Sequence, residues 1–213
     1  MPFVSWQPPS DNMLQLQAIT RRITQLKHEI QREKNRLHAE SYRATPPDLI
    51  ERDIHVHIRH MDRRIQHLTD KGMALIEAES VLRGLFQRLR SIPGIGQTSA
   101  LRILAELAVL PKDMQPAQWV AHAGLDPRPH ESGSSLHPPR KITKVGNKFL
   151  RTALYMPALV AIRNKPQVKA FYDKLIAAGE NPRLAITAVM RKRLHTIWGI
   201  WKYDQDFDGP KFY

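Results

Sequence analysis

A short serine-rich segment is the part of this sequence with the clearest potential for covalent chemistry. Ser132, Ser134 and Ser135 surround Gly133 directly after a histidine and a glutamate, in a stretch without hydrophobic periodicity. A serine hydroxyl is a weak nucleophile unless a base, a metal ion or a cluster of cations stabilises its deprotonated form. Segments of serine and glycine also serve as flexible connectors. The residue types alone therefore leave a nucleophile and a plain connector as alternatives.

A basic stretch follows these serines. No Asp or Glu occurs between Glu131 and Asp173, whereas this interval holds Arg140, Lys141, Lys144, Lys148, Arg151, Arg163, Lys165 and Lys169. If a helix begins at Lys148, then Lys148 and Arg151 lie one turn apart on one face. A solvated basic face normally mixes both signs of charge. The asymmetry therefore favours a surface that binds phosphate groups, with a solvated face as the alternative.

The segment Gly94-Ile95-Gly96 is a second candidate for phosphate contact. It lies between two expected helices and is similar to a helix-hairpin-helix element. Glycines allow a tight turn, and the backbone N–H groups at a helix N-terminus attract a phosphate oxygen. Such a contact would carry no sequence specificity. A plain glycine-containing connection between helices is the alternative.

The histidines at positions 55, 57, 60 and 67 are the remaining candidates for metal binding. His57 and His60 share one helix face, but no carboxylate or thiolate stands at a matching spacing. We therefore expect no metal site in this segment.

Composition points to a nucleic-acid partner. The 213 residues include 33 Lys plus Arg against 20 Asp plus Glu, which gives a formal net charge of +13. The chain has no cysteine, which excludes a disulfide scaffold, a thiolate zinc site and a cysteine nucleophile. No stretch has the length of a membrane span, and the N-terminus does not read as a secretory signal. We expect a cytoplasmic, nucleoid-associated protein with no membrane partner.

Two long helices are expected in the first half of the chain. Apolar residues recur at spacings of three, four and seven from Leu16 to Leu37 and again from Ile54 to Leu89. This pattern predicts an antiparallel coiled-coil hairpin over residues 13–90, preceded by a linker remnant at 1–12. The second seam is longer than the first, so part of it is expected to need another partner and to drive self-association.

A compact helical domain is expected over residues 91–203, followed by a frayed tail at 204–213. No segment shows the alternation typical of a strand, so the expected fold class is all-α. Helices are expected at 98–110, 117–123, 148–164, 168–178 and 182–201, with a polar loop at 126–146.

A set of spaced motifs gives this chain a resemblance to a known family. The motifs are Ile92-Pro93-Gly94-Ile95-Gly96, Ala123-Gly124-Leu125-Asp126-Pro127, Ser132-Gly133, and Gly146-Asn147-Lys148 followed by Leu150-Arg151. Together they resemble the C-terminal transposase domain of the DEDD insertion-sequence recombinases, insertion-sequence family 110, which includes Piv/MooV-type invertases. The resemblance covers residues 90–200, and the hairpin is similar to the linker of that family. Asp126 departs from it, because members commonly have Ala there.

The resemblance implies a function and assigns residues to it. It implies DNA transposition by transesterification, with Ser132 as the nucleophile, and it extends to a bridge RNA, to dimers and tetramers and to a divalent metal, Mg²⁺, in an N-terminal RuvC-like domain. The residues expected to contact nucleic acid are Gly94, Ile95, Gly96, Arg140, Lys141, Lys144, Asn147, Lys148 and Arg151.

The sequence begins where the RuvC-like domain of that family should already have ended. We therefore expect the chain alone to be inactive and to act with a full-length transposase partner.

Two further hypotheses remain beside the transposase. The alternative function is a non-catalytic helix-hairpin-helix nucleic-acid-binding module with coiled-coil dimerisation. A third possibility is a coiled-coil assembly protein whose charge is incidental.

Overall fold

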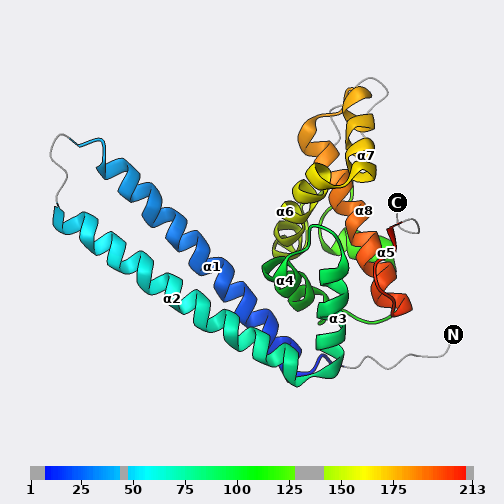
Figure 1. Ribbon diagram of the computed structural model, residues 1–213, viewed down its shortest axis with the longest axis horizontal. Helices are drawn as coiled ribbons and strands as arrows, with labels where there is room; N and C mark the ends of the chain where they lie inside the picture. The colour runs from blue at the N-terminus through cyan, green and yellow to red at the C-terminus, as the bar shows by residue number, and fades with distance from the viewer. Residues whose placement is uncertain (1–7, 44–47, 128–141, 210–213) are drawn as a thin grey trace.

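The structure is a long helical hairpin joined to a compact helical domain (Figure 1). The computed structural model describes residues 8–43, 48–127 and 142–209. Its helices are α1 (Asp11–Glu40), α2 (Asp48–Ala78), α3 (Ser80–Ser91), α4 (Gln97–Leu107), α5 (Pro116–His122), α6 (Lys148–Asn164), α7 (Pro166–Ala177) and α8 (Pro182–Tyr203). In these ranges there is no β-strand, and an isolated bridge joins Pro127 to Ile142. The all-α prediction is confirmed.

Helices α1 and α2 lie side by side in opposite directions and form the hairpin. Ser10 begins α1, because its hydroxyl accepts a hydrogen bond from the backbone N–H of Met13 at 3.3 Å. Leu26, Ile30 and Met61 are buried together in the half of the hairpin that projects away from the compact domain. These residues belong to the two apolar series that the sequence analysis identified, so the pairing of the two helices follows from their spacing.

The second helix ends earlier than expected. It stops at Ala78, and Glu79 adopts an extended conformation (φ −120°, ψ 113°) before α3 begins in a new direction. The hairpin helices are therefore nearly equal, at 30 and 31 residues. Leu82 and Leu89, which were expected to extend the seam, are buried within this chain. The expectation that the longer seam needs another partner was wrong, since the compact domain covers its last part.

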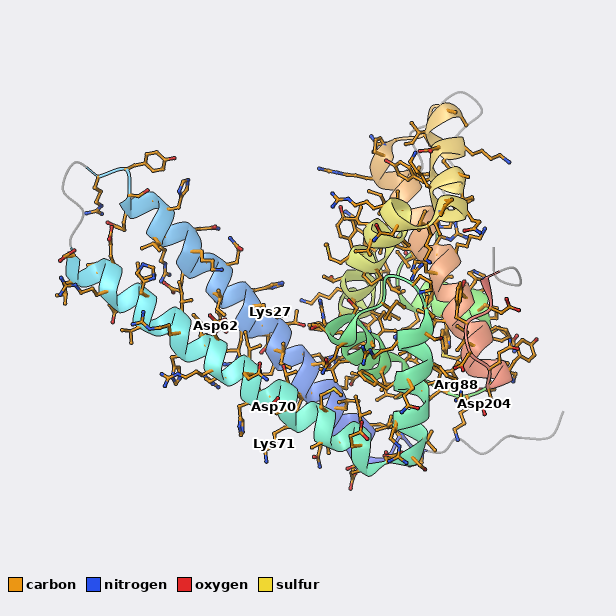
Figure 2. The ribbon with its side chains drawn as sticks, viewed as in Figure 1. Lys27, Asp62, Asp70, Lys71, Arg88 and Asp204 are labelled. Carbon is orange, nitrogen blue, oxygen red and sulfur yellow. The ribbon has the colours of Figure 1, made fainter. Side chains whose placement is uncertain are left out.

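The compact domain packs α3 to α8 around one main core, which the base of the hairpin also enters through Leu16 and Ile76. The five helices expected in this half are confirmed to within three residues at each end, and α6 has the expected bounds. The tail also differs from expectation, because Asp204 forms an ion pair with Arg88 at 2.6 Å and the backbone N–H of Phe207 donates to the Ser91 hydroxyl. Figure 2 shows the Arg88 and Asp204 side chains close together.

Candidate nucleic-acid interface

Both ends of the segment that carries the serines are held side by side. Pro127 and Ile142 form a bridge, and the backbone N–H of Thr143 donates to the backbone oxygen of Asp126 at 3.0 Å. The Thr143 hydroxyl also donates to the Asp126 carboxylate at 2.7 Å. Asp126, which departs from the family motif, therefore closes the base of this loop.

Two glycines near the Pro127–Ile142 bridge allow the two chain segments to pack closely against each other. Gly124 has φ +62°, and a Cβ atom there would lie 2.6 Å from the backbone oxygen of Val145. Gly146 has φ +120°, and a Cβ atom there would collide with the backbone oxygen of His122. Only glycine fits such positions without strain. The A-G-L-D-P and G-N-K motifs, far apart in the sequence, are thus packed backbone to backbone.

Asn147 fixes the start of α6 and uses every polar atom of its side chain. Its Oδ1 accepts from the backbone N–H groups of Phe149 and Leu150, at 2.9 and 3.0 Å. Its Nδ2 donates to Glu106 Oε2 at 2.7 Å and lies 3.3 Å from His122 Nε2. Because the amide nitrogen is a donor, the imidazole nitrogen that faces it accepts.

Glu106, on α4, is the centre of this network. Its side chain is buried, and Arg21 of α1 donates to both carboxylate oxygens, at 2.9 and 2.8 Å. Gln17 of α1 adds a hydrogen bond at 3.2 Å. One buried carboxylate thus joins the hairpin, through α1, to the residue that begins α6, through Asn147.

The network also sets the ionisation of His122 and Arg21. Burial lowers the pKa of His122, the nearby carboxylate of Glu106 raises it in part, and the charge of Arg21 lowers it. The hydrogen bond to Glu106 raises the pKa of Arg21. His122 is therefore held neutral more strongly than an exposed histidine.

The predicted basic residues fall into two groups. Arg151 is half-buried and donates to the backbone oxygen of Ala123 at 2.7 Å, so it stabilises the A-G-L-D-P turn. Lys144 and Lys148 are exposed, and Lys144 adopts φ +55°, which is unusual for a residue with a side chain. The structure brings Lys144, Asn147, Lys148 and Arg151 together around the start of α6.

The Gly94-Ile95-Gly96 segment lies at the start of α4 and its residues differ in role. Gly94 has φ +87°, and a Cβ atom there would lie 3.1 Å from the backbone oxygen of Pro157. Ile95 is buried in the main core. Gly96 is the N-cap of α4, has an ordinary φ of −79°, and has no atom within 4 Å of the place where a Cβ would stand. Nothing within the described chain therefore requires glycine at position 96.

Three predicted residues lie outside the described ranges: Ser132, Arg140 and Lys141. Among the residues that the structure describes, no three His, Asp or Glu side chains come together as a possible metal site. None of the helices in these ranges is long and apolar enough to cross a bilayer.

Sequence reasoning missed three of the residues that organise this region. No recognisable motif surrounds Glu106, Arg21 or Arg193 in the sequence. Arg193 is fully buried and donates to the backbone oxygen of Pro93, so it holds the P-G-I-G turn against α8. A lone charge within an otherwise apolar helix face, as at Glu106 in α4, was the available signal.

Comparison with known proteins shows which family this chain resembles. The model described as "Transposase IS116/IS110/IS902 family" matches residues 86–173, the interval that contains the turns and motifs above. Over these residues the chain is similar to the IS116/IS110/IS902 transposase family. A pilin gene-inverting protein of Moraxella bovis is 29% identical over 204 residues, which are 95% of this chain and 62% of that protein. A transposase for insertion sequence element IS1111A, from Coxiella burnetii, is 32% identical over 117 residues, which are 54% of this chain and 32% of that protein.

The chain spans about three fifths of the length of the pilin gene-inverting relatives. The family match and these relatives confirm the expected resemblance to insertion-sequence family 110 and to Piv-type invertases. The family match contains α4, α5, α6 and the segment that carries the serines.

Proposed function

We propose that this chain is the DNA-binding, serine-bearing part of a transposase or site-specific recombinase that acts by transesterification. One observation carries the proposal: within the interval matched by the family, Pro127 and Ile142 are paired, and Ser132 lies between them in the sequence. A loop with a fixed base can present a nucleophile at a reproducible place. Two relatives are named for rearranging DNA, one as a transposase and one as a gene-inverting protein.

The proposed reaction exchanges one phosphate ester for another. The hydroxyl of Ser132 loses its proton, its Oγ forms a bond to a DNA phosphorus, and one P–O ester bond of the strand breaks to leave a strand hydroxyl. Because one ester replaces another, the exchange needs no nucleotide hydrolysis. Cations next to the phosphate would offset the charge that develops on its oxygens.

The cations proposed for this role are Arg140, Lys141, Lys144 and Lys148, of which the described Lys144 and Lys148 are exposed. Asn147 and Arg151 have internal partners, and we assign them to holding the loop base and the start of α6. Gly94 and Ile95 would fix the helix-hairpin-helix turn. The open space at Gly96 lets a phosphate approach the N-terminus of α4.

Three further parts of the proposal come from the family resemblance. The hairpin would act as an antiparallel coiled coil through which copies of the chain, or a full-length transposase partner, associate. A bridge RNA would be a second nucleic-acid partner. A divalent metal held by a RuvC-like domain would supply charge neutralisation, and no step assigned to the residues of this chain passes through that metal.

The test is the covalent adduct. The chain is mixed with a family transposase that has an intact RuvC-like domain and an alanine in place of its own nucleophilic serine, together with the DNA on which that transposase acts. We expect a DNA-linked peptide at Ser132, found by peptide mass spectrometry, and its loss in Ser132→Ala. Ser134→Ala and Ser135→Ala are the matched controls and should retain it.

Three other results would contradict parts of this proposal. An adduct at Ser134 or Ser135 would refute the assignment of the nucleophile. DNA binding without any adduct in this mixture would favour the non-catalytic nucleic-acid-binding module. Cleavage by the chain alone would refute the requirement for a metal-binding domain.

A further inference from the structure

The junction where α1 of the hairpin meets α4 and α6 joins Lys148 to three cations that no motif predicts, Arg21, Lys27 and Arg102. A narrow crevice there is lined by Thr20 and Thr24 of α1, Arg102 and Glu106 of α4, and Phe149 of α6. Arg21 and Lys148 lie over the Phe149 ring, at 5.0 and 5.3 Å from its centre. Lys27 follows Thr24 by about one turn of α1. Figure 2 shows Lys27 near the place where the hairpin leaves the compact domain.

Among the described residues, Lys27, Arg102 and Lys148 have no partner of opposite charge in contact. Glu106 is paired with Arg21 at 2.8 Å and also accepts from Gln17 and Asn147. In the described ranges, no hydrogen bond or ion pair reaches the Lys27 ammonium or the Arg102 guanidinium. The junction thus holds more positive charge than its carboxylate neutralises.

The electrostatics agree with this arrangement. Burial lowers the pKa of Arg102, and the charge of Glu106 only partly opposes the effect. Partial burial lowers the pKa of Lys27, and the positive charge of Arg102 lowers it further. Holding two like charges close together without a partner costs free energy. A leucine or methionine at position 102 would fill the same space without this cost.

We propose that Lys27, Arg102 and Lys148 bind the phosphate groups of a nucleic-acid backbone at the junction of the hairpin with the compact domain. The inference rests on the proposed nucleic-acid binding and extends it to a residue of the hairpin. The three cations come from three different helices and are not enclosed in one cavity, as suits an extended polyanion and not a small ion. The hairpin then takes part in binding nucleic acid directly.

The position of Arg102 connects this junction to the start of α4. Gly96 and Arg102 are six residues apart on one helix, so they are separated by about 9 Å along its axis. Successive phosphates of one strand rise by about 3.4 Å along a duplex. The distance along the axis is thus only a few nucleotides, although six residues also turn the helix by about 240°, so the backbone must pass around α4 to contact both.

The test compares two double variants of the full chain. Lys27→Met with Arg102→Met removes two of the unpaired charges and keeps the apolar stems. Lys71→Met with Lys112→Met removes two exposed cations from α2 and from the α4–α5 connection, and serves as the matched control. Binding of a duplex DNA and of a structured RNA of equal length is measured by fluorescence anisotropy over a range of salt concentrations, after circular dichroism has compared the fold of each variant.

We expect the first variant to lower the slope of log K against log salt by about two units on duplex DNA, and to weaken binding about tenfold at low salt, while the control changes neither. If the salt slope and the affinity decreased by these amounts for the RNA but not for the DNA, RNA would be the polymer bound at the junction. Acylation of lysines followed by mass spectrometry gives a readout in the unaltered chain, in which nucleic acid should protect Lys27 and leave Lys71 reactive.

The failures can be told apart. If the unaltered chain binds both polymers normally but the two double variants behave alike and Lys27 is not protected, the junction is not a phosphate site and the proposed function stands. If the unaltered chain binds neither DNA nor RNA, both proposals are wrong.

Discussion

The side-chain nitrogen of Asn147 lies 2.7 Å from the buried carboxylate of Glu106. This contact joins the residue that begins α6 to the acid that Arg21 of the hairpin holds from the opposite side. The orientation of the hairpin and the position of the loop base therefore depend on the same carboxylate. A charge-assisted hydrogen bond between buried groups is costly to remove, because each partner left behind has lost its water.

Replacing Glu106 by Gln should destabilise the protein by about 2 kcal/mol. The glutamine has nearly the same shape but leaves the Arg21 guanidinium without its ionic partner and replaces one acceptor by a donor. The value is at the low end for a broken buried pair because the Arg21 side chain is 39% exposed. Urea denaturation followed by circular dichroism gives the free energy of unfolding.

Glu29→Gln is the matched control for this experiment. Glu29 pairs with Arg22 on the surface at 3.5 Å, and exposed pairs contribute less than about 1 kcal/mol. Equal losses in the two variants would mean that Glu106 is not the centre of the network.

Stability should fall as the pH is lowered from 7.5 to 5.5, and His122 should account for part of the fall. Its pKa is lowered in the folded chain, chiefly by burial, so below a pH of about 6.5 the unfolded chain takes up a proton that the folded chain resists. His122→Gln keeps a hydrogen-bond acceptor for Asn147 and does not titrate, so the variant should lose less stability over this range. Urea midpoints measured at both pH values test this.

His195 is the internal comparison, because burial, and then the charge of Arg191, also lowers its pKa. His195→Gln should remove a further part of the pH dependence, and the double variant should remove both. A His122→Gln chain whose stability falls as steeply as that of the unaltered chain would contradict the assignment.

Alanine at Gly146 should destabilise the protein more than alanine at Gly96. Gly146→Ala should destabilise the protein by at least about 2 kcal/mol, because the backbone has φ +120° and the new methyl group meets the His122 carbonyl. Gly96→Ala should cost less than about 1 kcal/mol, since φ is ordinary and the space is empty, with the loss coming from a poorer helix N-cap. Thermal unfolding measures both.

Gly96→Ala also tests the proposed phosphate contact at the N-terminus of α4. A methyl group at position 96 would keep a phosphate away from the N-terminus, so Gly96→Ala should weaken DNA binding while the fold is retained. Unchanged binding by Gly96→Ala would remove this helix N-terminus from the proposed interface.

Local spacing predicted most helices and missed the breaks and the buried charges. The capping residue Asn147, the prolines at 116, 166 and 182 and the apolar series of the hairpin are local signals, and the helices that they mark are found. The break at Glu79 has no glycine or proline beside it. Its cause is tertiary, because Leu82 and Leu89 are buried only if α3 turns into the main core.

In the candidate site, too, the sequence could predict the local turns but not the contacts between distant segments. The glycines at 94, 124 and 146 could be recognised as turns from the sequence, and the structure gives each a positive φ. The sequence could not distinguish an exposed cation such as Lys148 from Arg151, which faces a carbonyl inside the fold. That distinction requires the packing of the A-G-L-D-P turn on α6, which residues 25 or more positions apart create.

The projecting half of the hairpin should open without loss of the compact domain. Leu26, Ile30 and Met61 form a small cluster separate from the main core, with Ile58 and Ile65 packed against it. Met61→Asp places a charge in this cluster, where burial without a partner is unfavourable. Hydrogen exchange followed by mass spectrometry should show faster exchange in residues 22–40 and 48–68 and unchanged protection in α4. Val56→Asp, at a position 53% exposed on the same helix, is the control and should change neither. Loss of protection throughout the chain in Met61→Asp would mean that the hairpin and the compact domain unfold as one cooperative unit.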